Sequence, residues 1–231
     1  MNSRDDEELS AAERSAAERS AAERSDDVPA RPRGPGPIGG EITHIVYGFG
    51  ERLSIPALTK RHSSVGIMGL FALVNGVVSI AIMAGAAAIT GQPLIFPSLG
   101  PTAFLLFYTP TAPAACPRNT IIGHAIGVGA GYLSLVVFGL TSAGPALAEG
   151  VTWPRVGAAA LSLGLTSGVM VWARVPHPPA GATTLIVSLG IITTPPQLAV
   201  LMLAVVLLVL QGYVINHLAG IDYPRWSARK T

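Results

Sequence analysis

Two short stretches of the sequence share a Pro-x-x-Gly-x-Thr pattern that suits the binding of a small anion. The first runs from Pro97 to Thr102 and the second from Pro178 to Thr183. Proline lacks an N–H and pushes the preceding residue out of the helical region, so we expect extended chain up to each glycine and a helix starting near each threonine. The first turn of a helix leaves about four N–H groups without partners and carries about half a positive charge. Two such helix starts facing one cavity would bind an anion.

The predicted binding residues are the hydroxyls and glycines of these stretches together with two histidines. They are Ser98, Gly100, Thr102, His124, His177, Gly181 and Thr183. Replacing Gly100 or Gly181 by a β-branched residue is expected to abolish transport without preventing membrane insertion. The alternative is that both stretches are structural kinks whose free backbone groups are satisfied by neighbouring helices.

The two histidines offer a positive charge or a proton. His177 stands directly before the second stretch, and its imidazole changes charge near neutral pH. The aligned residue of the first stretch is Phe96, so the two stretches are not chemically equivalent. His124 lies inside an expected membrane helix, where an ionisable group is a functional candidate. For each histidine the alternative is a structural hydrogen bond within the packed helices.

Few other residues could carry chemistry. From His62 to Ile221 the sequence holds four formal charges, which are Arg118, Glu149, Arg155 and Arg174. Arg118 and Arg174 are expected at span ends, where they could steer anions or simply reach the interface. Because this region has no carboxylate pair and its histidines lack metal-ligand spacing, we predict neither an enzyme, nor a metal site, nor a cofactor. Basic clusters are too sparse for nucleic-acid binding.

The elements that must position these residues are membrane helices. Half of the 231 residues are apolar and 12% are charged, against about 25% charged in soluble domains. Four apolar stretches have the length of about 20 residues that a membrane-spanning helix requires. They are Ser64–Ile89, Thr120–Leu140, Val156–Ala173 and Gln197–Leu218. Glycines spaced by four in the middle two predict close helix packing, within the protomer or in a homo-oligomer.

Two further apolar stretches, Leu94–Tyr108 and Pro178–Ile192, are short and broken by proline and glycine. The matching motifs inside them are 81 residues apart, which predicts two repeats of long helix, broken segment and long helix. If both broken segments cross the membrane, the chain crosses it six times. Both termini, Arg118 and Arg174 then lie on the cytoplasmic side, and Arg155 lies on the opposite side. The second repeat is then inverted, and matched broken segments of inverted repeats mark a transporter's binding site.

The flanking regions differ in character. Residues 1–40 are expected to form a disordered, low-complexity tail, because Ser-Ala-Ala-Glu-Arg occurs three times and a Pro/Gly-rich stretch follows. The tail is acidic, with nine acids and four arginines in residues 1–27. Residues 41–61 are expected to form a juxtamembrane segment, 62–220 the transmembrane domain, and 221–231 a cytoplasmic C-terminal tail.

Three ordered motifs give the sequence a resemblance to the HPP family of integral membrane proteins. They are FPSLGPTA at Phe96–Ala103, PRNTIIGH at Pro117–His124, and HPPAGAT at His177–Thr183, which contains the His-Pro-Pro for which the family is named. The resemblance covers roughly Arg61 to Leu218. It implies a helical transmembrane domain, and plastid and cyanobacterial relatives associated with nitrite transport imply a small-anion substrate.

The leading hypothesis is a transporter or channel in the cell membrane for a small, nitrite-like inorganic anion, bound between the two broken segments. Its partners would be the substrate anion and the lipid bilayer. The alternative is a membrane scaffold or sensor that moves nothing and whose acidic tail binds a partner protein.

Overall fold

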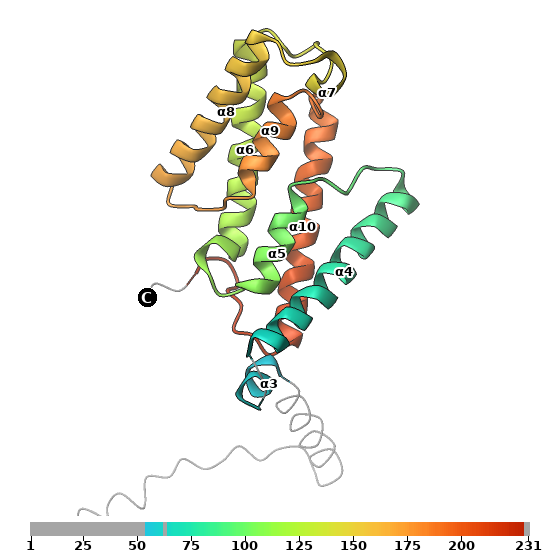
Figure 1. The fold of residues 1–231 in the computed structure, drawn as a ribbon, viewed down its shortest axis with the longest axis vertical. Helices are drawn as coiled ribbons and strands as arrows, with labels where there is room; N and C mark the ends of the chain where they lie inside the picture. Colours follow the sequence, from blue (N-terminus) through green and yellow to red (C-terminus); the bar gives the residue numbers. More distant parts are fainter. Residues whose placement is uncertain (1–53, 62–63, 229–231) are drawn as a thin grey trace, which may run out of the picture. The chain divides into compact units, whose positions relative to one another are not determined.

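The structure is a computed structural model that describes residues 54–61 and 64–228. Over these ranges the chain is helical, without strands (Figure 1). The elements are α3 (Ile55–Arg61), α4 (Ser64–Thr90), α5 (Leu99–Tyr108), the 3₁₀ turn η1 (Pro113–Ala115), α6 (Pro117–Val137), α7 (Ala146–Glu149), α8 (Trp153–Trp172), α9 (Ala180–Ser188) and α10 (Pro195–Leu218). The prediction of an all-helical polytopic membrane protein is confirmed. The tail of residues 1–40 lies outside the described residues.

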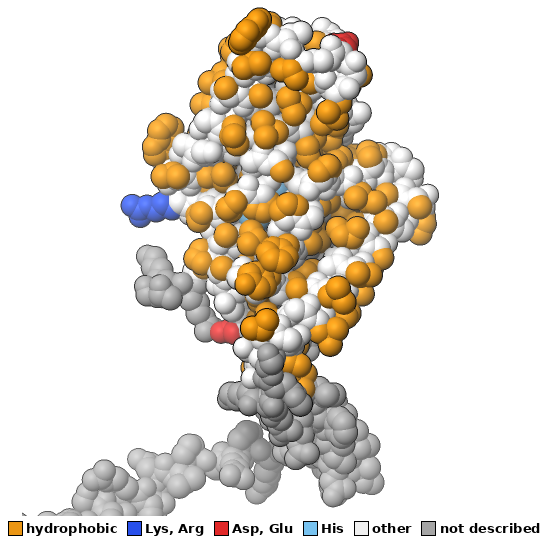
Figure 2. Space-filling view, viewed as in Figure 1, with side chains coloured by type: hydrophobic (Ala, Val, Ile, Leu, Met, Phe, Trp, Pro, Cys, Tyr) orange, Lys and Arg blue, Asp and Glu red, His pale blue; other side chains and the backbone are white. Residues whose placement is uncertain are grey.

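Four of these helices are long and apolar enough to span a membrane. They are α4, α6, α8 and α10, with 27, 21, 20 and 24 residues, and at a rise of about 1.5 Å per residue they cover about 30 to 40 Å. The helices α6, α8 and α10 carry proline in the first turn, where its missing N–H costs nothing. Figure 2 shows hydrophobic side chains spread over the visible face, with charged ones only at its edges. This surface suits contact with lipid.

The short helices α5 and α9 run in opposite directions. At the end of α5, the carbonyl of Leu106 accepts a hydrogen bond of 2.9 Å from Asn216, near the end of α10. At the end of α9, the carbonyl of Ser188 accepts one of 3.1 Å from Arg155, near the start of α8. Figure 1 shows both helices starting at mid-height and leading to opposite ends of the bundle.

The first turns of α5 and α9 correct one prediction. The helices begin at Leu99 and Ala180, three residues before the expected threonines. Ser98 and Pro179 already have helical backbone angles. The φ angle that proline imposes is also the φ angle of a helix's first turn, so the residues that follow each proline can enter the helix directly. The amides of residues 180–182 donate to the carbonyls of residues 177–179 at 2.9–3.0 Å, so these donors of α9 are already satisfied.

A glycine face on α6 lets α9 approach closely. A Cβ at Gly127 would lie 2.7 Å from the Ala180 carbonyl oxygen, and one at Gly131 would lie 2.7 Å from the Val187 Cβ. Real Cβ atoms do not approach backbone or branched carbons so closely, so any larger residue would push α9 away. The spacing of four therefore marks packing within the protomer.

The segment after α10 folds back over η1. The Tyr223 hydroxyl donates to the Ala115 carbonyl at 2.7 Å, and the Arg118 amide donates to the Trp226 carbonyl at 2.9 Å. Burial, reinforced by the nearby Cys116, raises the pKa of Tyr223, so the phenol stays protonated and able to donate. Up to residue 228 the C-terminal segment is therefore part of the packed domain.

The glycine face predicts a sharp difference between two alanine substitutions on α6. Gly127→Ala should lower the free energy of unfolding by about 1–3 kcal/mol, because its methyl group meets a backbone carbonyl. Gly129→Ala is the matched control, since its Cβ would meet nothing within 4 Å, and it should stabilise the helix by up to about 1 kcal/mol. Thermal unfolding in detergent micelles measures both. Equal effects would contradict the packing described for this face.

Candidate functional site

His124 lies at the centre of a buried polar cluster. Its Nδ1 is 2.6 Å from the Thr183 hydroxyl of α9, and its Nε2 is 3.0 Å from the Thr102 hydroxyl of α5. The side chains of all three residues are fully buried. The threonines that match between the two broken segments therefore bind opposite nitrogens of a single imidazole.

His177 is the second histidine of this cluster. Its Nε2 lies 3.2 Å from the Nε2 of His124 and 3.3 Å from the Thr102 hydroxyl, and its Nδ1 lies 2.7 Å from the Ala114 carbonyl oxygen. The two rings are tilted by 57°, with centroids 4.9 Å apart. Gly123 makes room for His177, because a Cβ there would lie 2.8 Å from the His177 Cβ.

Donor and acceptor chemistry assigns the protons of the neutral cluster. A carbonyl only accepts, so His177 carries its proton on Nδ1 and its Nε2 accepts. The two facing nitrogens are paired when His124 donates from Nε2, and its Nδ1 then accepts from the Thr183 hydroxyl. The Thr102 hydroxyl donates to the Ser98 carbonyl at 2.9 Å. In this arrangement the imidazole N–H groups and both of these hydroxyls are already donating.

Three other predicted binding residues have different surroundings. The Ser98 hydroxyl is fully buried and has no hydrogen-bond partner within the part of the chain that the structure describes. Gly100 is exposed, and a Cβ there would meet nothing within 4 Å. A Cβ at Gly181 would meet only Leu163, at 3.4 Å. Neither glycine has a positive φ, so the structure gives no steric reason for a β-branched residue to disrupt either position.

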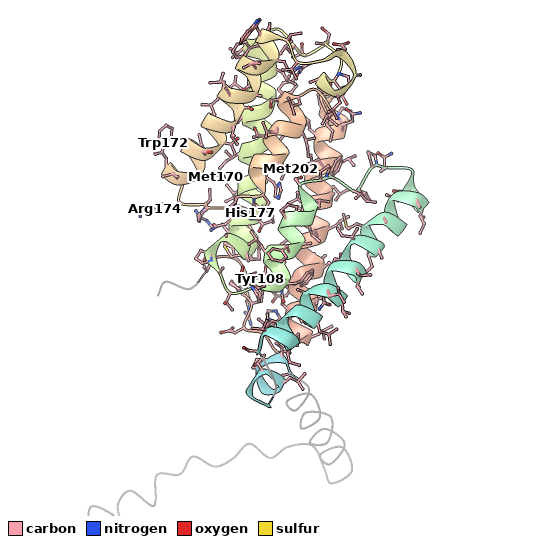
Figure 3. All side chains as sticks on the ribbon, viewed as in Figure 1. Tyr108, Met170, Trp172, Arg174, His177 and Met202 are labelled. Carbon is pink, nitrogen blue, oxygen red and sulfur yellow. The ribbon has the colours of Figure 1, made fainter. Side chains whose placement is uncertain are left out.

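A cavity of about 650 Å³ lies between α8, α9 and the segment that joins them. Its lining includes Met170, Arg174, His177 and Gly181. Figure 3 shows His177 inside the domain and Arg174 pointing away from it. Because the His177 side chain is fully buried, the cavity ends at the histidine without reaching the cluster behind it.

The two arginines predicted to steer anions lie close together. Arg118 donates through its side chain to the Arg174 carbonyl at 3.3 Å and to the Asn119 side chain at 3.2 Å. Arg174 has a left-handed backbone with φ of 53° and an exposed side chain. Only Arg174 lines the cavity, so it is the better placed of the two to attract an anion.

Two residues with buried polar contacts were not among the predicted binding residues. The hydroxyl of Thr120 lies 3.4 Å from Nδ1 of His177, and its place one helical turn before His124 was the available signal. Arg155, for which the sequence predicted only its side of the membrane, is 3% exposed and donates to the carbonyls of Ser188 and Gly144. A cation at the C-terminal end of α9 is favoured by the helix dipole, which no spacing in the sequence indicates.

Several buried hydroxyls of α8 and α9 have no partner among the described residues. They belong to Thr166 of α8 and to Thr184 and Ser188 of α9, and all three side chains are fully buried. In an apolar environment an unpaired hydroxyl is costly. Together with Ser98, these residues supply donors that are not committed to the protein.

The model of the HPP transmembrane region family matches residues 62–224. The chain belongs to this family. In this HPP protein the two prolines of the naming motif keep His177 extended and then begin α9, which places the imidazole beside His124. No curated protein and no solved structure matches the chain.

Neighbouring threonines of α9 provide a test of the cluster. Thr183→Val removes the donor to His124 and leaves a buried ring nitrogen unsatisfied, which should lower the free energy of unfolding by about 1–3 kcal/mol. Thr184→Val is isosteric and removes a hydroxyl without a partner, so stability should be unchanged or higher. Denaturant or thermal unfolding of the purified variants compares them. A larger loss for Thr184→Val would refute the assigned hydrogen bonds.

Proposed function

We propose that this HPP protein transports a small inorganic anion of the nitrite type through the cluster of His124, His177, Thr102 and Thr183. The observation that carries the proposal is a fully buried set of imidazoles and hydroxyls inside a membrane domain, at the starts of two broken helices. Buried polar groups at this depth are costly and are typical of substrate paths.

The charges around the cluster support an anion over a cation. In the part of the chain that the structure describes, the acidic residues are Glu149 in α7 and Asp222 after α10, both exposed and neither on a membrane-spanning helix. A cation in the cluster would have no carboxylate among the described residues to neutralise it, whereas an anion needs no acidic partner there. Arg174 at the cavity adds a positive charge on the approach.

The opposite directions of α5 and α9 support an inverted repeat. In this interpretation α4, α5 and α6 correspond to α8, α9 and α10, and each broken segment crosses by combining extended chain with a short helix. Six crossings then place both termini on one side of the membrane. The positive-inside bias makes that side cytoplasmic, because Arg118, Arg174 and Arg225 all lie toward it. The membrane would be the cell membrane.

Transport is tested by flux into proteoliposomes. Nitrite, nitrate, formate and bicarbonate would be supplied to vesicles that contain the wild type, His177→Ala or His217→Ala. Uptake of at least one anion should exceed that of protein-free vesicles and should fall by about 10–100-fold in His177→Ala, as expected for a lost hydrogen bond to a charged group. The matched control is His217, which lies on the exposed end of α10 and bonds only locally to Tyr213.

Flux that is unchanged in His177→Ala would remove this histidine from the path. The absence of flux for all four anions, with folded protein, would overturn the proposed function. The alternative of a scaffold or sensor rests on residues 1–40, which lie outside the described residues. Deleting them should leave flux intact in a transporter and abolish partner binding in a scaffold.

Orientation is tested by single cysteines in a Cys116→Ser background. Ser227→Cys follows α10, and Gly150→Cys lies between α7 and α8 at the opposite end. A membrane-impermeant maleimide applied to intact cells should label Gly150→Cys and spare Ser227→Cys until the cells are opened. The reverse pattern would invert the topology, and labelling of both from outside would contradict the three crossings that the six-crossing topology places between these two positions.

A further inference from the structure

We infer that the two histidines couple anion transport to protons, so that one anion and one proton bind together at the His124–His177 pair and cross as an electroneutral unit. The inference rests on the proposed function and adds the coupling ion. It stands on the geometry of two imidazole nitrogens that face each other at 3.2 Å in a fully buried site.

In the neutral pair the facing nitrogens are one donor and one acceptor. The Nδ1–H group of His177 donates to the Ala114 carbonyl at 2.7 Å, so the Nε2 of His177 has no proton and accepts from His124. His124 in turn accepts from the Thr183 hydroxyl on its other nitrogen. The neutral pair therefore satisfies itself and offers an anion no N–H group.

A proton added to the His177 Nε2, on the electron pair that accepts from His124 in the neutral state, removes this hydrogen bond. Both facing nitrogens then carry N–H groups that point at each other and repel. An anion oxygen that enters as the two nitrogens move apart accepts a hydrogen bond from each and restores the pairing. The N–H bond on the His177 Nε2 forms when the proton arrives and breaks when the proton leaves with the anion.

The surroundings make the anion the natural counter-ion of that proton. Among the described residues, the helices and turns around the pair carry no acidic side chain. Their charged or titratable groups, besides the pair itself, are Cys116, Arg118, Tyr108, Tyr132, Arg155 and Arg174, together with Tyr213 and His217 of α10, which packs against α5 and α6. A buried positive charge without a partner costs several kcal/mol. Protonation without an anion and anion binding without a proton are therefore both disfavoured, and linkage makes each promote the other.

Proton coupling is tested in proteoliposomes that enclose a pH-sensitive dye, with nitrite and nitrate as probes. An inward nitrite gradient should acidify the lumen by one proton for each anion, above the signal of protein-free vesicles. A valinomycin-set potassium potential of either sign should leave the initial rate unchanged. Lowering the external pH should raise the rate by up to about tenfold per unit. Nitrate serves as a second probe because it has little neutral acid that could leak through lipid.

Variants separate the pair from the other histidine of the described chain. His177→Gln keeps a hydrogen-bonding side chain without a titrating group and should lose proton movement and pH dependence, as should His124→Gln. His217→Gln, on the exposed end of α10, should retain both. The wild-type proton-to-anion ratio decides the question even if a histidine variant fails to fold.

The outcomes distinguish the coupling from the transport itself. Anion uptake that moves no protons and accelerates with an inside-positive potential would overturn the coupling and leave the proposed function in place. The absence of uptake for either anion in the wild type would overturn both. Anion-dependent acidification that persists in His177→Gln and His124→Gln would place the coupling group elsewhere.

Discussion

The structure depends on satisfying one buried imidazole from both sides. His124 sits inside a membrane helix, where its two ring nitrogens have no water to bond and each unsatisfied polar group costs several kcal/mol. The partners come from the two broken segments, Thr102 on one nitrogen and Thr183 on the other. Two short helices that run in opposite directions are therefore tied to the same point of α6, and their prolines set where each of them begins.

Close approach of the backbones makes this arrangement possible. The glycine face of α6 allows α9 to lie against it with almost no side-chain volume between them, and Gly123 lets His177 reach His124. At its far end α9 is held by Arg155, a buried cation on its last carbonyls. A nine-residue helix has little stability of its own, so it is these contacts that fix the position of Thr183.

The sequence predicts the helices much better than it predicts the contacts. Long apolar runs and the Pro/Gly breaks locate four spans and two broken segments, because hydrocarbon thickness and proline geometry act locally. The helix starts were misplaced by three residues, since Ser98 and Pro179 adopt helical angles that the pattern leaves open. The pairing of His124 with His177 joins residues 53 apart, and no local rule brings them together. The predicted donors included the backbone amides at the start of α9, which the structure shows already bonded, and the hydroxyls and imidazoles that the structure brings together.

The two broken segments resemble each other where they bind His124 and differ one position before their prolines. Phe96 packs into the apolar cluster of α4, α5 and α10, and it has no polar atom to offer. His177, at the aligned position, joins the polar cluster and forms part of the cavity wall. A second histidine in place of Phe96 would add a titrating group without another acceptor like the Ala114 carbonyl to fix its proton. The asymmetry thus leaves one pair of facing nitrogens, separated from the cavity on the α8–α9 side by the His177 side chain itself.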